Sequence, residues 1–146
     1  MENVILRQRT RKRRLKYEIT GKHHGGNRRA AMWLPQVTHA EEFAIFDVAD
    51  FNDIFDNAGS LYGVQPLGEE QLRHIGVWNE QVAKFPRKRA NEPWHGYPVW
   101  PLEIAREGRH KKPKKLRPPK EIFERMCDAK LITERQRMRL MNGDYA

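Results

Sequence analysis

The chain has 146 residues and a formal net charge of +9 at pH 7, and this length suits one domain with extensions. Apolar residues make up 38% of the sequence and charged residues 32%, which is apolar-poor and charge-rich for a globular domain. No apolar run approaches the roughly 18 residues of a transmembrane helix, so we expect no membrane association. The composition predicts a small core with strongly charged segments on or outside it.

The cysteine content and the N-terminal residues indicate the cellular compartment in which the protein is expected. Cys127 is the only cysteine, so a disulfide within the chain is impossible. The apolar run 4–6 is too short for the core of a signal peptide. We therefore expect a cytoplasmic protein, or a nuclear one in a eukaryote, where the basic runs 11–14 and 111–115 would suit nuclear import.

The charges are distributed unevenly along the chain. Residues 1–30 carry ten basic and two acidic side chains, and residues 81–120 carry twelve basic and three acidic ones. Between them, residues 31–80 carry one basic and nine acidic side chains. Residues 121–146 carry five of each kind. Like charges concentrated in a short segment repel one another, and a polyanion relieves that repulsion. The pattern favours a nucleic-acid partner over any particular reaction.

The first 30 residues are interpreted as a basic arm followed by a loop. The arm occupies residues 1–15, and the alternation of polar and apolar residues over 16–20 predicts a short strand. Gly25 and Gly26 indicate a turn or loop. The apolar run 30–37 contains Pro35, so we expect an edge strand there at best.

Residues 31–86 are predicted to form an acidic helical core. Thr38 and Glu41 have the spacing of a capping box, and Gly59 marks a helix end, so one helix over 39–58 is favoured. A strand over 43–48 followed by a short helix is the alternative. Apolar residues spaced by three and four predict a second helix over 68–85; they are Leu72, Ile75, Trp78, Val82 and Phe85.

The rest of the chain is predicted to be a basic Pro/Trp-rich irregular segment, 87–118, and a C-terminal helical hairpin, 119–146. The hairpin joins helices over 119–130 and 133–142, the second with a capping box formed by Thr133 and Gln136. A helix-turn-helix that reads a DNA groove is the alternative. The predicted fold class is therefore α+β, mostly helical, with one small core.

The function predicted from these features is nucleic-acid binding, with RNA favoured, within a larger nucleoprotein assembly. Basic side chains would contact phosphates, and Trp94 and Tyr97, spaced by three in an extended segment, would stack on unpaired bases. The alternative for these rings is that they pin the irregular segment onto the core. The candidate residues are Arg7, Arg9, Arg11, Lys12, Arg13, Arg14, Arg28, Arg29, Arg87, Lys88, Arg89, Trp94, Tyr97, Lys111, Lys112, Lys114, Lys115 and Arg117.

Two other functions remain open at the level of sequence. His23 and His24 beside Arg28 and Arg29 are weak candidates for the acid and base of a small, toxin-like nuclease. An adaptor would instead bind a protein partner through the acidic region 38–58. The paired ligand spacings of zinc sites do not occur, so we expect no metal and no cofactor.

Overall fold

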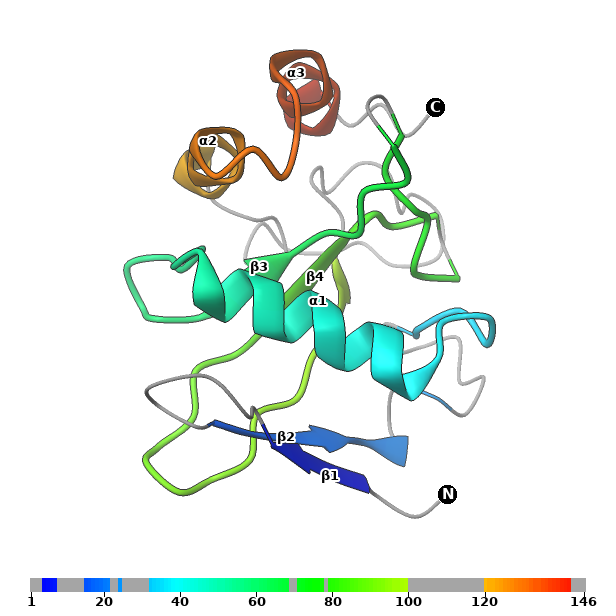
Figure 1. Ribbon diagram of the computed structural model, residues 1–146, viewed down its shortest axis with the longest axis vertical. Coiled ribbons are helices and arrows are strands. Elements are labelled where there is room, and N and C mark those ends of the chain that lie inside the picture. The colour runs from blue at the N-terminus through cyan, green and yellow to red at the C-terminus, as the bar shows by residue number, and fades with distance from the viewer. Residues whose placement is uncertain are drawn as a thin grey trace, which may run out of the picture.

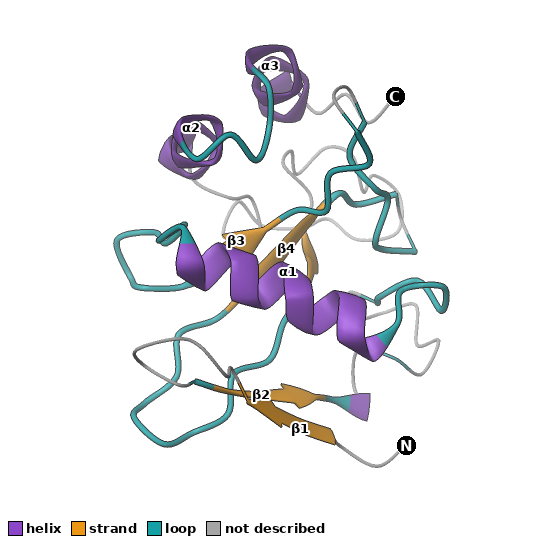
Figure 2. Ribbon diagram, viewed as in Figure 1, coloured by secondary structure: helices purple, strands orange, loops and turns teal. Residues whose placement is uncertain are grey.

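The computed structural model describes residues 4–7, 15–21, 24, 32–68, 71–77, 79–99 and 120–142. Strands β1 (Val4–Arg7) and β2 (Lys16–Ile19) form one antiparallel hairpin. Strands β3 (Leu61–Gly63), β4 (Val82–Phe85) and β5 (Tyr97–Val99) form a second antiparallel sheet in the order β3-β4-β5. The helices are α1 (His39–Phe51), α2 (Lys120–Asp128) and α3 (Glu134–Asn142) (Figure 2). The α+β class is confirmed, whereas the expectation of a mostly helical chain is wrong.

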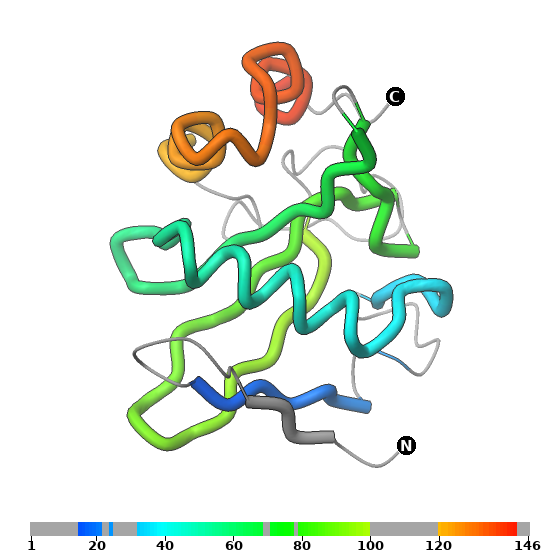
Figure 3. The backbone as a smooth tube through the Cα atoms, in the orientation of Figure 1, coloured from blue at the N-terminus to red at the C-terminus, as the bar shows by residue number. Residues whose placement is uncertain are grey.

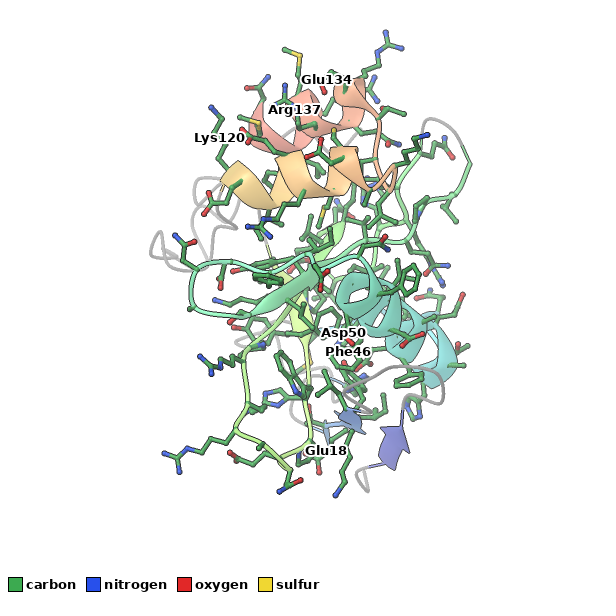
Figure 4. All side chains as sticks on the ribbon, turned by 60° about the vertical axis from the view of Figure 1, so that its left-hand side comes forward. Glu18, Phe46, Asp50, Lys120, Glu134 and Arg137 are labelled. Atoms are coloured by element: carbon green, nitrogen blue, oxygen red, sulfur yellow. The ribbon has the colours of Figure 1, made fainter. Side chains whose placement is uncertain are left out.

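The elements are stacked along the long axis of the molecule. Figure 1 shows the β1–β2 hairpin at one end, α2 and α3 at the other, and α1 with the three-stranded sheet between them. The turned view in Figure 4 agrees, with Glu18 at the hairpin end and Lys120, Glu134 and Arg137 at the opposite end. None of the described helices is long and apolar enough to cross a lipid bilayer.

Two groups of buried side chains hold these layers together. The first lies around α1, β2 and β4 and includes Tyr17, Phe46, Phe85 and Trp94. The second joins the sheet to α2 and α3 and includes Ile54, Tyr62, Val82, Val99, Ile122 and Met126. Helix α1 approaches β3 closely at Gly63, where a Cβ atom would lie 2.7 Å from Ile45 Cγ2. Burial of these apolar surfaces is the main favourable contribution to folding.

The helix predicted after Thr38 is confirmed, together with its capping box. Thr38 Oγ1 accepts a hydrogen bond from the Glu41 backbone N–H at 3.1 Å, and Glu41 Oε1 accepts one from the Thr38 N–H at 2.9 Å. The helix is shorter than predicted, because Asn52 is its C-cap and Asp53 has a φ of 54°. The strand predicted at 16–20 is confirmed as β2.

The helix predicted over 68–85 is wrong. The backbone N–H groups of Ile75 and Gly76 both donate to the Glu80 carbonyl oxygen, and Asn79 has a φ of 66°, so a turn lies where the helix would continue. Val82 to Phe85 then form β4, the middle strand of the sheet. The helix-like spacing of apolar residues arises because one buried segment, with Leu72 and Ile75, precedes the turn and another, β4, follows it. Residues 32–37 form no strand either, although Trp33 makes an isolated bridge with Gly76.

The C-terminal hairpin matches the prediction. Thr133 Oγ1 accepts from the Gln136 N–H at 3.1 Å, and Gln136 Oε1 accepts from the Thr133 N–H at 2.8 Å, so the second capping box is present. Helix α2 buries Ile122, Phe123 and Met126 against the second group of core residues. The hairpin therefore closes one end of the core.

Replacing Gly96 tests how tightly the core packs near β5. A Cβ atom there would lie 2.2 Å from Cδ1 of the buried Phe85 and 3.0 Å from the Lys84 carbonyl oxygen. We expect Gly96→Ala to lower the free energy of unfolding by about 1–3 kcal/mol, as overpacking does, measured by urea denaturation. The exposed Ala90→Ser is the control and should change it by less than about 0.5 kcal/mol. Equal stability of Gly96→Ala and the unmodified chain would contradict this packing.

Candidate nucleic-acid interface

The loop between β4 and β5 is held against β2 by backbone hydrogen bonds. The Trp94 N–H donates to the Lys16 carbonyl oxygen at 2.8 Å, and the Glu18 N–H donates to the Trp94 carbonyl oxygen at 2.7 Å. Figure 3 shows the chain leaving β4, running to the hairpin end of the molecule and returning beside β2. Lys16 and the basic residues 87–89, which are far apart in the sequence, are therefore neighbours.

A groove of about 400 Å³ opens between these two segments. Lys16 lines it from the start of β2 and Leu15 from just before that strand, and residues 87–92 line it from the loop. Among the described residues, its cations are Lys16, Arg87, Lys88 and Arg89, and its carboxylate is Glu92. Its apolar lining comprises Leu15, Phe55, Leu61 and Trp94. The groove thus combines excess positive charge with apolar surface.

The turn at 56–60 positions Arg87. Asp56 Oδ1 accepts hydrogen bonds from the backbone N–H groups of Ala58 and Ser60, at 2.9 and 3.0 Å, which fixes the turn. Ser60 Oγ accepts from the Arg87 N–H at 3.2 Å. Gly59, with a φ of 87°, leaves room for the Arg87 side chain, whose Cδ lies 2.9 Å from where a Cβ would be. The start of the basic loop is therefore fixed in place.

The predicted basic arm is not a free arm. Strand β1 pairs with β2 so that the Cα atoms of Arg7 and Lys16 are partners, and the segment 8–14 joins these two positions. The other basic candidates lie outside the described residues; they are Arg9, Arg11, Lys12, Arg13, Arg14, Arg28, Arg29, Lys111, Lys112, Lys114, Lys115 and Arg117. The groove brings three of the predicted residues together, Arg87, Lys88 and Arg89. It also includes Lys16, which the prediction missed. Lys16 follows the predicted basic run 11–14 with only Leu15 between.

The aromatic residues of this region differ from the expectation. Trp94 is only 4% exposed and its ring lies 5.8 Å from that of Phe46, so neither face is open to a base. Tyr97 belongs to β5 and is half-buried, and burial raises the pKa of its phenol. The rings therefore pin this segment to the core, which was the alternative interpretation. Phe55, 37% exposed, is an aromatic residue of the groove that sequence reasoning missed.

His24 takes part in a buried network rather than standing free as a base. Its Nε2 is hydrogen-bonded to Glu42 Oε1 at 2.6 Å and its Nδ1 to the Thr20 carbonyl oxygen at 2.5 Å. Tyr17 donates its phenol proton to Glu42 Oε2, and Glu42 is 1% exposed. Because both ring nitrogens are engaged, His24 has no nitrogen available to accept a proton from a substrate.

Other elements of a nuclease site are not found in the described part of the chain. His23 lies outside the described residues. Among the residues that the structure describes, no three His, Cys, Asp or Glu side chains converge as ligands for a metal ion.

The His24–Glu42 pair makes stability depend on pH. Burial opposes the charged imidazolium, but the hydrogen bond and the charge of Glu42 outweigh it, so the pKa of His24 is raised above its ordinary 6.5. A raised pKa in the folded state adds stability that is complete below the unfolded pKa and is lost as pH rises through the folded pKa. We expect the free energy of unfolding lost in His24→Gln to be larger at about pH 5.5 than at about pH 8.5.

Urea denaturation at the two pH values measures this difference, and the exposed Ala90→Ser serves as the control. This substitution adds and removes no group that titrates in this range, and it lies away from the His24–Glu42 hydrogen bond in the sequence. The control should therefore change stability by a similar amount at both pH values. A loss in His24→Gln that does not vary with pH would show that the folded protein does not favour the charged ring.

Comparison with known proteins finds no relative of this chain. No protein-family model matches the chain, and no curated protein sequence or solved structure is significantly similar to it. Those residues form a cationic groove with an apolar lining at the hairpin end of an α+β domain.

Proposed function

We propose that the chain binds nucleic acid, RNA in preference to duplex DNA, through the groove between β2 and the β4–β5 loop. The observation that supports this proposal is the convergence of Lys16 with Arg87, Lys88 and Arg89 around one opening. Phosphate contacts by Lys and Arg provide affinity that is independent of sequence and weakens with salt. Arginine adds two-pronged recognition of phosphate oxygens, which lysine lacks.

The preference for a single strand follows from the size and lining of the groove. Its volume of about 400 Å³ is that of a small-ligand site, so it suits one unpaired nucleotide rather than a double helix. Leu15 offers apolar surface to a base or ribose, and so does Phe55 on the side of its ring away from Arg125, whose guanidinium carbon lies 4.8 Å from the ring centroid. The cations of the groove would hold the flanking phosphates. The further basic candidates in 9–14 and 111–117 add positive charge to the chain, which should strengthen its attraction for a longer strand.

Binding assays with three probes of equal length test the proposal directly. The probes are single-stranded RNA, single-stranded DNA and duplex DNA, each labelled and titrated at several salt concentrations. We expect the tightest binding to single-stranded RNA, and an affinity that falls steeply between about 50 and 200 mM salt. Intact probe on the same gels separates binding from cleavage. If no probe binds, or if binding is insensitive to salt, the proposal is wrong.

Neutralising the basic loop should weaken binding and reduce its dependence on salt. The variant is Arg87→Gln/Lys88→Gln/Arg89→Gln. If each cation contacts one phosphate of a single strand, the slope of log affinity against log salt should fall by about 2. Fluorescence anisotropy across the salt series measures both the affinity and the slope.

The matched control removes the same charge from the opposite end of the molecule. Lys120, Lys130 and Arg135 are exposed residues of the C-terminal hairpin, and each is replaced by Gln. This control should change the affinity slightly through net charge and leave the slope almost unchanged. Equal effects of the two triple variants would mean that overall charge, rather than the groove, binds the nucleic acid.

A further inference from the structure

The groove contains a side chain that phosphate binding does not use. Glu92 is the carboxylate among its described residues, and four cations line the same opening. A carboxylate near these cations repels phosphate oxygens and so reduces the affinity that the cations provide. The natural partner of Glu92 is therefore a part of the ligand other than phosphate.

The Glu92 carboxylate is available to a ligand. Its side chain is exposed at the groove. Within the described part of the chain, no ion pair joins this carboxylate to a cation of the groove. Its oxygens can therefore accept hydrogen bonds from a ligand, while the cations remain separate contacts for phosphates.

The backbone fixes Glu92 at the groove. Its N–H donates to the Arg89 carbonyl oxygen at 3.1 Å, which closes a turn in which Asn91 has a φ of 73°. Asparagine tolerates this left-handed conformation better than most residues do. Two residues after Glu92, the Trp94 N–H donates to the Lys16 carbonyl oxygen at 2.8 Å. Because the chain is held on both sides, the Glu92 backbone is in place before a ligand binds.

The four RNA bases offer different hydrogen-bonding edges to a carboxylate. An ionised carboxylate only accepts hydrogen bonds, and its two oxygens can pair side by side with two neighbouring N–H groups. Guanine offers such a pair on its Watson–Crick edge, the N1–H and the N2 amino group. Adenine and cytosine offer an amino group beside an unprotonated ring nitrogen, and uracil offers one N–H between two carbonyl oxygens. Guanine is therefore the base whose edge fits a carboxylate without bringing an acceptor against it.

We propose that Glu92 makes the groove selective for guanine, by accepting hydrogen bonds from the N1–H and the N2 amino group of an unpaired base. This inference rests on the proposed binding of single-stranded RNA in the groove. The apolar lining would contact the face of the same base, while the cations contact neighbouring phosphates. Glu92 then provides the sequence preference, and the phosphate contacts provide affinity that does not depend on sequence.

Five labelled RNA strands test the selectivity. All are uridine-rich and of equal length, and the central nucleotide is guanosine, inosine, adenosine, cytidine or uridine. We expect the full-length chain to bind the guanosine strand at least about fivefold more tightly than the adenosine, cytidine and uridine strands, as measured by fluorescence anisotropy. Inosine keeps the N1–H but lacks the N2 amino group, so its strand should bind with intermediate affinity.

Glu92→Gln tests the carboxylate itself. The substitution keeps the size of the side chain, removes its charge and replaces one acceptor oxygen by an amide NH₂ donor. The preference for guanosine should fall to about twofold or less. Affinity for the all-uridine strand should rise slightly, because repulsion of phosphate is removed. A variant that failed to fold would instead lose affinity for every strand, so the all-uridine strand distinguishes the two cases.

Glu124→Gln is the matched control. Glu124 is an exposed residue of α2, at the opposite end of the molecule from the β1–β2 hairpin, and its replacement makes the same change in net charge. This control should keep the preference for guanosine and change the affinity for all five strands by the same small factor. A preference lost to the same extent in both variants would show that Glu92 is not the residue that recognises the base.

The outcomes separate this inference from the proposed function. If no strand binds, the proposed function and the selectivity both fail. If all five strands bind equally and with steep salt dependence, the groove binds RNA without recognising a base, and only the selectivity is wrong. Equal affinities for the guanosine and inosine strands, or a preference that Glu92→Gln retains, would also exclude the pairing of Glu92 with guanine.

Discussion

The two hydrogen bonds between the Trp94 backbone and β2 are the interaction on which the rest of the structure depends. They join the β1–β2 hairpin to the loop of the β3-β4-β5 sheet and so close the first group of core residues. The buried ring of Trp94 packs between these parts, against Phe46. Without this junction, Lys16 and Arg87 would belong to separate surfaces, and the groove would not exist. The packing of the core and the shape of the groove therefore both depend on the backbone hydrogen bonds of Trp94.

Charge separation along the chain becomes charge separation in space. The groove at the hairpin end gathers Lys16 and the basic loop 87–89, while α1 carries four acidic residues, Glu41, Glu42, Asp47 and Asp50. Opposite charges at a distance attract only weakly through water and salt, so the acidic helix does little to neutralise the groove to which we assign phosphate binding as a proposal.

Features set by local geometry were predictable from the sequence, and features set by distant pairing were not. The capping boxes of Thr38 and Thr133 depend on atoms three residues apart, so their spacing identified both helices. Strand β4 forms by pairing with β3 and β5, which are distant in sequence. The apolar spacing over 68–85 resembles that of a helix, but a turn at Gly76 and Asn79 interrupts the segment. For the site, the basic loop was predicted, but Lys16 and Phe55 were missed because only the folded chain brings them to the groove. Trp94 was ambiguous, since a ring suited to stacking is equally suited to burial.

Pairing of Arg7 with Lys16 has a consequence for the contact that we propose with a ligand. The pairing fixes the backbone of Arg7 beside Lys16, which lines the groove, before any ligand binds. A backbone that is already ordered loses little further conformational entropy on binding. Phosphate binding at Lys16, as proposed, therefore has a smaller entropic cost than binding by an unstructured tail would have.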